Sequence, residues 1–256
     1  MSLWGGYSDY FNPEMERATG PVAHSGHEEA SYDGLRQDGV PVRWPGPAAK
    51  LRWRGLRTKR AIDVSLAVLL LAVFAPLACL LAVLIKMSGP GTVLYKHPRI
   101  GRSGRIFSCL KFRTMYADAD ERLRSLLASD ASLARQWTVQ QKLDQDPRVT
   151  HVGRLLRATS LDELPQLINV LRGDMSLVGP RPVTPSELAR YGAAAELYLQ
   201  VRPGLTGVWQ VSGRNLISYD SRVQLDRDYI TNWRLTTDLR ILARTPGAVL
   251  SRRGAS

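Results

Sequence analysis

VSLAVLLLAVFAPLACLLAVLI, residues Val64 to Ile85, is the stretch that decides the fold of this chain. It contains 22 residues and no charged side chain. At about 1.5 Å of rise per residue, a helix of this length reaches across the roughly 30 Å hydrocarbon core of a bilayer. Pro76 lies near its middle, removes a backbone hydrogen bond and crowds the preceding turn. We therefore expect a membrane helix that kinks or breaks at Ala75 and Pro76.

Basic residues flank this apolar stretch on both sides. The segment before it, KLRWRGLRTKR at residues 50–60, has six positive charges and no negative one. Seven lysines and arginines follow it before the first acid, Asp118. Because positive charge marks the cytoplasmic side of membrane proteins, neither end is expected to be external. The pattern favours a re-entrant helix-break-helix that enters and leaves one leaflet, with a kinked single span as the alternative. Lys59 is expected to neutralise Asp63 from one turn away.

The overall charge indicates the kind of partner, and the spacing of the cysteines indicates whether disulfides or a zinc site are expected. The formal net charge is +12, and residues 50–256 carry 32 basic against 16 acidic side chains. A positive field of this size favours nucleic acid, anionic lipid headgroups or phosphorylated small molecules. Cys79 and Cys109 have no C-x-x-C spacing, so the sequence predicts neither a disulfide framework nor a zinc site. A cytosol-facing location fits this cysteine usage.

The chain divides into three predicted regions. Residues 1–49 are rich in glycine, proline, serine and acids without a regular period, and are expected to be a disordered tail. Residues 50–88 form the basic collar and the re-entrant helix. Residues 89–256 form a cytosolic domain on the membrane surface.

The pattern of the third region predicts a mostly helical α+β fold. Residues 92–101 and 105–115 have the alternation of two short strands and form a β-hairpin. Residues 118–137, 219–233 and 236–250 have the apolar spacing of amphipathic helices. Each of these helices either lies at the membrane interface or simply packs against the domain.

The segment with the most chemistry is RLLRATSLDELPQLINVLRGDMSLVGPRP, residues 154–182. Leucines at helical spacing predict a short helix that begins near Ser160 and stops at Gly173. One interpretation of its acids is purely structural, because Ser160 and Glu163 have the spacing of a capping box and Asp162 complements the helix dipole.

A second interpretation of these acids is phosphate chemistry. Arg157 lies one turn before Asp162, and Arg181 is held between two prolines. A carboxylate that attacks a phosphoryl group needs cations around it, and oxygen ligands favour Mg²⁺, or Mn²⁺, over zinc. Adjacent helical residues point about 100° apart, so Asp162 and Glu163 are expected to have different roles instead of sharing one proton.

Four ordered motifs resemble one family. They are KRAIDV at 59–64, KFRTM at 111–115, the run at 146–182, and RPGLTGVWQVSGR at 202–214. Over residues 57–250 the chain resembles the monotopic phosphoglycosyl transferases, or bacterial sugar transferases, that start exopolysaccharide and glycoconjugate assembly. Its layout is similar to that of the short exopolysaccharide type.

The resemblance implies a site and a location. Asp162 would be the nucleophile and a ligand of Mg²⁺, and Glu163 would assist it. Arg157 and Arg181 match positions for binding substrate phosphate, with Lys111 and Arg214 as further candidates. The helix would anchor the enzyme monotopically in the cytoplasmic leaflet of the bacterial inner membrane. Relatives often have Ser-Pro at the break, so Ala75 removes a hydroxyl that could satisfy the freed backbone.

The reaction that the resemblance implies has two steps. Asp162 attacks the sugar-bearing phosphate of a nucleoside diphosphate sugar, for which a UDP-hexose is the expected donor, and UMP leaves. Polyprenyl phosphate, such as undecaprenyl phosphate, then takes the phosphosugar. Nucleic acid is not an expected partner, and homo-oligomer formation is left open. The alternative function is a non-catalytic basic membrane protein that recruits nucleic acid or anionic lipid.

Overall fold

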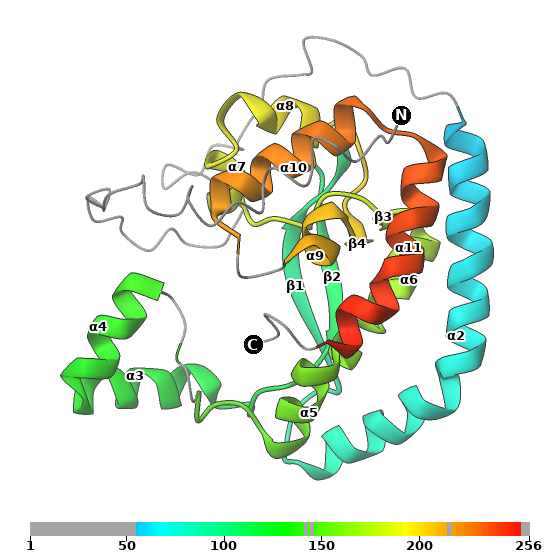
Figure 1. Cartoon of the computed structure of the whole chain (residues 1–256). Helices are drawn as coiled ribbons and strands as arrows, with labels where there is room; N and C mark the ends of the chain where they lie inside the picture. Colours follow the sequence, from blue (N-terminus) through cyan, green and yellow to red (C-terminus); the bar gives the residue numbers. More distant parts are fainter. Residues whose placement is uncertain (1–54, 141–142, 144–145, 214–216, 252–256) are drawn as a thin grey trace. The chain divides into compact units, whose positions relative to one another are not determined.

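The structure is a computed structural model that describes residues 55–140, 143, 146–213 and 217–251. The expected tail at 1–49 lies outside these residues, and the predicted division into three regions stays a prediction. Helices dominate, which confirms the mostly helical α+β class (Figure 1). The helices and strands in chain order are α2 (Leu56–Met87), β1 (Leu94–Ile100), η3 (Arg102–Gly104), β2 (Ile106–Phe112), α3 (Ala119–Ser129), α4 (Ala131–Gln140), α5 (His151–Thr159), η4 (Leu161–Glu163), α6 (Gln166–Arg172), β3 (Ser176–Val178), α7 (Pro185–Ala189), η5 (Gly192–Ala194), α8 (Ala195–Tyr198), β4 (Gly204–Thr206), α9 (Val208–Ser212), α10 (Tyr219–Thr231) and α11 (Leu235–Leu250).

The apolar stretch forms a single bent helix. α2 has 32 residues, and Pro76 lies inside it. The helix changes direction along its length (Figure 1). Proline is a common cause of such bends, because it removes one hydrogen bond while the neighbouring turns keep theirs. The expected kink is therefore present, whereas the helical assignment continues through Ala75 and Pro76 without a break.

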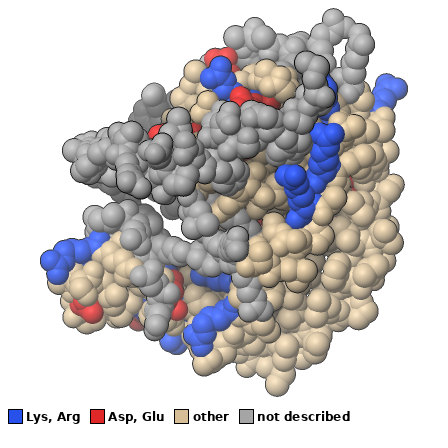
Figure 2. All heavy atoms as spheres, in the orientation of Figure 1, with Lys and Arg blue, Asp and Glu red and all other residues tan. Residues whose placement is uncertain are grey.

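Most of α2 is not covered by the rest of the protein. Its most apolar 18-residue window is only 11% buried, and α2 is the one helix among the described residues that is long and apolar enough to cross a membrane. The side chains of Val68, Leu69 and Val73 are each more than half exposed. Figure 2 shows an almost uncharged surface on the side where α2 lies. This surface is available to lipid.

The predicted hairpin is present. β1 and β2 pair antiparallel, with Leu94 opposite Phe112 and Ile100 opposite Ile106. A second, parallel pair joins β3 to β4, and nothing in the sequence pattern indicated it. Gly204 makes this pair possible, because a Cβ atom there would collide with the backbone nitrogen of Gly179.

Two of the three predicted amphipathic helices are confirmed, as α10 and α11. The third, expected over 118–137, is instead two helices, α3 and α4. Asp130 separates them with an extended backbone, and its carboxylate accepts hydrogen bonds from the backbone nitrogens of Ser132 and Leu133. An aspartate at this position starts a new helix instead of continuing the old one.

An apolar cluster fixes the C-terminal half of α2 to the domain. It consists of Leu81 and Ile85 on α2, Phe112 on β2 and Leu156 on α5, all nearly inaccessible. Burying one such side chain stabilises a fold by about 1.5–3 kcal/mol. Phe112 and Leu156 directly adjoin Lys111 and Arg157 in sequence, so this cluster sets the position of the site relative to α2.

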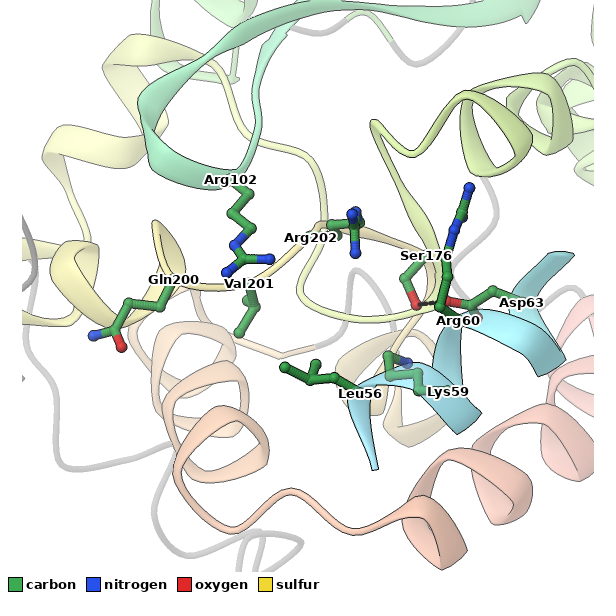
Figure 3. Close-up of a pocket in the computed structure, with 9 residues that line it drawn as sticks. All are labelled: Leu56, Lys59, Arg60, Asp63, Arg102, Ser176, Gln200, Val201 and Arg202. Atoms are coloured by element: carbon green, nitrogen blue, oxygen red, sulfur yellow. Dashed lines mark hydrogen bonds between the residues drawn. The ribbon is translucent and has the colours of Figure 1, made fainter. Parts of the chain in front are cut away.

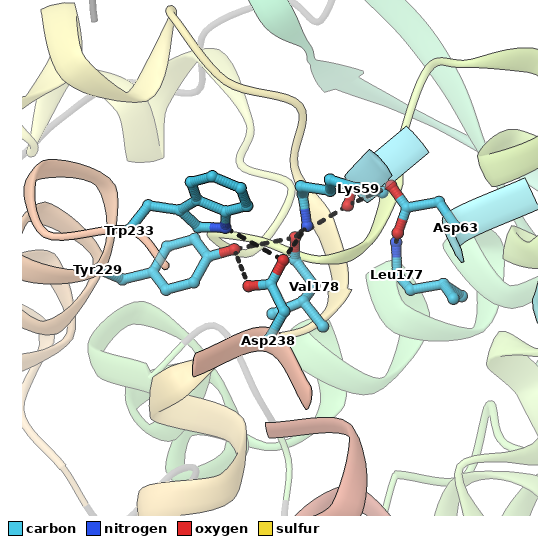
Figure 4. Close-up of polar contacts among 8 residues, drawn as sticks. Lys59, Asp63, Leu177, Val178, Tyr229, Trp233 and Asp238 are labelled. Atoms are coloured by element: carbon cyan, nitrogen blue, oxygen red, sulfur yellow. Dashed lines mark hydrogen bonds and ion pairs between the residues drawn. The ribbon is translucent and has the colours of Figure 1, made fainter. Parts of the chain in front are cut away.

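A polar network fixes the N-terminal end of α2 (Figure 4). Lys59 forms a buried ion pair with Asp238 of α11, with 2.6 Å between Nζ and Oδ2. Asp63 accepts hydrogen bonds from the Ser176 hydroxyl at 2.8 Å and the Leu177 backbone nitrogen at 3.1 Å. The expected pairing of Lys59 with Asp63 is therefore wrong, because each side chain has a better-placed partner in a distant segment.

Candidate active site

The chain around Asp162 is shaped by a left-handed turn. Ser160 has φ 57°, ends α5, and is followed by the 3-10 turn η4. Its side chain makes no capping hydrogen bond, so the predicted capping box of Ser160 and Glu163 is wrong. α6 begins only after Pro165, and Gly173 ends it with φ 87°, as expected. The left-handed turn and Pro165 prevent one continuous helix from Ser160.

Lys111 brings the two acids together. Its Nζ atom lies 2.7 Å from Glu163 Oε1 and 3.6 Å from Asp162 Oδ2. The Asp162 residue is buried, with 8% exposure. One ammonium group from β2 thus contacts both carboxylates, and the expectation that the two acids have different roles stays a prediction.

Arg157 is the second cationic side chain whose charge acts on Asp162. Its Nε atom donates to the Thr114 hydroxyl at 3.0 Å, and its charge acts on Asp162. α5 packs closely on the end of β2, where a Cβ atom at Gly153 would collide with the Thr114 carbonyl oxygen. The Thr150 backbone nitrogen also donates to that oxygen, at 3.0 Å. These contacts hold Arg157 beside the nucleophile candidate.

The groups around Asp162 shift its pKa in opposite directions. Burial raises the pKa of Asp162 above its usual value, and Glu163 adds to this effect, whereas Lys111 and Arg157 lower it. Burial by itself would lower the pKa of Lys111, but Glu163 and Asp162 together raise it. An ionised Asp162 therefore depends on the cations around it, and Lys111 stays protonated.

Arg181 extends the basic surface away from Asp162. Its guanidinium lies 5.5 Å from the centre of the Trp209 ring, and Arg222 lies 4.0 Å from the same ring. The charge of Arg181 lowers the pKa of both Lys111 and Arg222. The charge of Arg181 thus acts both on the lysine that contacts the carboxylates and on a second cationic group.

Trp209 and Arg222 were not singled out from the sequence. The indole nitrogen of Trp209 and Nε of Arg222 are buried without a hydrogen-bond partner in the part of the chain that the structure describes. Buried donors of this kind favour a polar ligand. Trp209 lies within the motif at 202–214, whereas Arg222 lies in a helix that the pattern marked only as amphipathic.

Comparison with known proteins identifies the family. The model described as bacterial sugar transferase matches residues 54–252. The chain belongs to this family. The bacterial sugar transferase is 48% identical to the exopolysaccharide production protein ExoY of Sinorhizobium fredii over 211 residues, which cover 82% of this chain and 93% of that protein.

Two further relatives have names that state a reaction. The undecaprenyl-phosphate galactose phosphotransferase of Salmonella typhimurium is 48% identical over 77% of this sugar transferase and 41% of its own length. The UDP-glucose:undecaprenyl-phosphate glucose-1-phosphate transferase of Caulobacter vibrioides is 44% identical over 75% of this chain and 70% of its own length. The family makes this chain an enzyme, so a purely recruiting, non-catalytic protein is no longer the alternative.

The sugar transferase thus gathers most of its predicted site residues. Asp162, Glu163, Lys111 and Arg157 meet, and Arg181 lies alongside them. The fourth cationic candidate, Arg214, lies outside the described residues. Lys111, a weaker candidate from the sequence, contacts both acids.

The acids of the sugar transferase fit a magnesium ion held largely by substrate. Within the described ranges no group of three or more His, Cys, Asp or Glu side chains could hold a metal. Mg²⁺ commonly uses only one or two carboxylates and completes its shell with phosphate oxygens and water. Asp162 and Glu163 supply oxygen donors of the required kind.

Proposed function

We propose that this bacterial sugar transferase transfers a sugar-1-phosphate from a nucleoside diphosphate sugar, a UDP-hexose, to polyprenyl phosphate and releases UMP. The observation that carries the proposal is a buried carboxylate, Asp162, with cationic side chains of Lys111 and Arg157 around it. The names of the Salmonella and Caulobacter relatives support undecaprenyl phosphate as the acceptor. The reaction would be the first membrane step of exopolysaccharide or glycoconjugate assembly.

In the first step, an oxygen of Asp162 attacks the sugar-bearing phosphorus. A bond forms between that oxygen and phosphorus, the bond to the bridging oxygen breaks, and UMP departs with the bridging oxygen. Lys111 and Arg157 offset the negative charges that approach each other, and Arg181 binds the departing phosphate. Glu163 assists by holding the Lys111 ammonium beside Asp162. Mg²⁺, held by Asp162 with substrate oxygens, would supply further charge neutralisation when bound.

In the second step, a phosphate oxygen of the polyprenyl phosphate attacks the same phosphorus. The bond to Asp162 breaks, the carboxylate is regenerated, and a polyprenyl diphosphate sugar leaves. A covalent intermediate lets one phosphate site serve both substrates in turn.

The membrane segment supports a re-entrant, monotopic anchor in the cytoplasmic leaflet of the inner membrane. Residues 50–60 and the segment after Lys86 are both basic, and α2 bends between them. Arg113 donates to the Ile85 and Gly89 carbonyl oxygens at 3.0 and 2.9 Å, which ties the end of α2 to the hairpin. Such an anchor would hold Asp162 at headgroup level, within reach of a lipid-borne phosphate. A cysteine in the tail and another after Lys86 should both be shielded from an impermeant reagent in intact cells, whereas labelling of only one would establish a span.

The nucleotide product tests the reaction. Purified enzyme with polyprenyl phosphate and a panel of UDP-glucose, UDP-galactose and their N-acetylated counterparts should release UMP. Without acceptor, release should stop near one UMP per enzyme, because the phosphosugar stays on Asp162. Release of UDP would show ordinary glycosyl transfer instead.

Asp162→Asn should abolish both the release of UMP without acceptor and the turnover with acceptor, while membrane association is retained. Asp120→Asn, which changes an exposed acid in the first turn of α3, is the matched control and should leave turnover intact. Turnover by Asp162→Asn comparable to that of this control would exclude the nucleophile assignment.

A further inference from the structure

A cavity lies beside the first two turns of α2 (Figure 3). It contains none of the residues assigned to the site around Asp162. α2, the turn η3 and the segment before β4 contribute its walls. The lining residues are Leu56, Lys59, Arg60, Asp63, Arg102, Ser176, Gln200, Val201 and Arg202.

Three arginines from three separate segments converge on this cavity. Arg60 comes from α2, Arg102 from η3 and Arg202 from the approach to β4. Burial lowers the pKa of Arg202, and the charges of Arg60 and Arg102 lower it further. Asp63 opposes this effect on the pKa of Arg202 in part. The charges of Arg60 and Arg102 therefore both act on Arg202, and an anion beside Arg202 would relieve that repulsion.

The fold orients two of these arginines and leaves donors available. Arg60 donates to the Val170 and Leu171 carbonyl oxygens at 2.6 and 2.9 Å, at the C-terminal end of α6. Arg202 uses Nε to bind the Gly173 carbonyl oxygen at 2.7 Å. Within the described ranges, no hydrogen bond engages the terminal nitrogens of Arg202 or the guanidinium of Arg102.

The acidic residue of the cavity forms no hydrogen bond with these arginine donors. Asp63 is the one acidic residue among the described residues of the lining, and its two oxygens accept hydrogen bonds from Ser176 and Leu177. Lys59 is paired with Asp238. The arginines therefore keep their excess positive charge.

We propose that this cavity binds a phosphate group, and that the head group of an anionic membrane lipid supplies it. Guanidinium groups present paired donors that match phosphate oxygens. The cavity begins at Leu56, which is 42% exposed, and reaches Asp63, directly before the apolar stretch begins. If α2 enters the membrane as in the proposed function, on which this inference rests, the cavity lies at headgroup level. A bound phosphodiester would then fix the N-terminal end of α2.

The test uses the full-length enzyme in neutral detergent. Its thermal unfolding midpoint is followed while short-chain phosphatidylglycerol, short-chain phosphatidylcholine or inorganic phosphate is added. A ligand that binds only the folded protein raises the midpoint. Phosphatidylglycerol should raise it and phosphatidylcholine should not.

Arg102→Ala is the decisive variant and Arg105→Ala its matched control, because both side chains are exposed in the same hairpin turn and only Arg102 lines the cavity. Arg102→Ala should raise the phosphatidylglycerol concentration that gives half of the midpoint shift roughly tenfold. A tenfold loss of affinity is the size expected when one charge-assisted hydrogen bond is lost. Arg105→Ala should respond like the wild type. Arg102→Lys, which keeps the charge but loses the paired donors, should lie between them.

Each outcome decides between the alternatives. A response to inorganic phosphate as large as that to phosphatidylglycerol would support the phosphate site and replace the lipid by a soluble source. Equal responses of Arg102→Ala and Arg105→Ala, or no response of the wild type, would overturn the site. UMP release by the same samples is expected to be independent of the lipid response. Arg102→Ala should retain UMP release, and Asp162→Asn should retain the lipid response. The two measurements therefore distinguish a failure of the lipid-binding proposal from a failure of the proposed reaction.

Discussion

Breaking the ion pair between Lys59 and Asp238 should strongly destabilise the enzyme. Both side chains are almost inaccessible, with exposed fractions of 8% and 5%. Lys59 also donates to the Val178 carbonyl oxygen at 2.9 Å, and Asp238 accepts from the Tyr229 hydroxyl at 2.8 Å and the Trp233 indole at 3.1 Å. The pair therefore joins α2, β3, α10 and α11 through one polar centre (Figure 4).

The geometry sets the size of the effect. Asp238→Asn leaves the Lys59 ammonium buried without its carboxylate, which costs about 3–5 kcal/mol for a pair buried to this degree. Typical domains have only about 5–15 kcal/mol in total, so the loss should be large relative to the stability of the fold. Lys59→Met should destabilise less, because the carboxylate keeps Tyr229 and Trp233 as donors. The double variant Lys59→Met/Asp238→Leu should be more stable than the sum of its single changes predicts, because neither charge is stranded.

Urea unfolding in detergent, followed by tryptophan fluorescence, measures this effect. The control is Asp118→Asn, which breaks the exposed pair of Asp118 with Arg122 and should change the free energy of unfolding little. If Asp238→Asn lowers the unfolding midpoint no more than Asp118→Asn does, the network contributes no more than a surface pair and the reasoning is refuted.

Three further predictions follow from the site and the core. Lys111→Met removes a charge that lowers the pKa of Asp162, so the acid limb of the pH profile of kcat/KM should move to higher pH; an unchanged limb would exclude titration of Asp162 as its cause. Asp226 is fully buried, and burial raises its pKa from 3.8 to about 7, so folding takes up a proton between these values and stability falls as pH rises through them. The difference in free energy of unfolding between Asp226→Asn and the wild type should therefore shift in favour of Asp226→Asn as pH rises from about 4 to about 7, and stay constant above that. Urea unfolding midpoints measured across this pH range test this, and a difference that does not change with pH would contradict it. Gly153→Ala places a methyl group against the Thr114 carbonyl oxygen and should lower both the thermal midpoint and UMP release, whereas Gly247→Ala, with open space around it, should lower neither.

Local patterns in the sequence predicted several elements correctly. The length of the apolar stretch and Pro76 predicted a long, bent α2, and alternation predicted the hairpin of β1 and β2. Apolar spacing also predicted α10 and α11. These features depend on backbone geometry and on side chains a few residues apart, which a linear sequence displays directly.

Contacts between distant segments were decided only by the tertiary structure. Lys59 pairs with Asp238, 179 residues away, although Asp63 lies one turn from it in sequence. Lys111 meets Glu163 across 52 residues and also contacts the neighbouring Asp162. Neither partner can be inferred from spacing, because packing of whole helices and strands determines which buried charges meet.

For the apolar stretch itself, the sequence determined that a long helix forms and that proline bends it. The tertiary structure decided what holds this helix, namely the buried network around Lys59 at one end and the packing of Leu81 and Ile85 at the other. The physical reason is that helix formation needs only local hydrogen bonds and apolar side chains. Its attachment needs buried charges and apolar surfaces from segments that become neighbours only after the chain has folded.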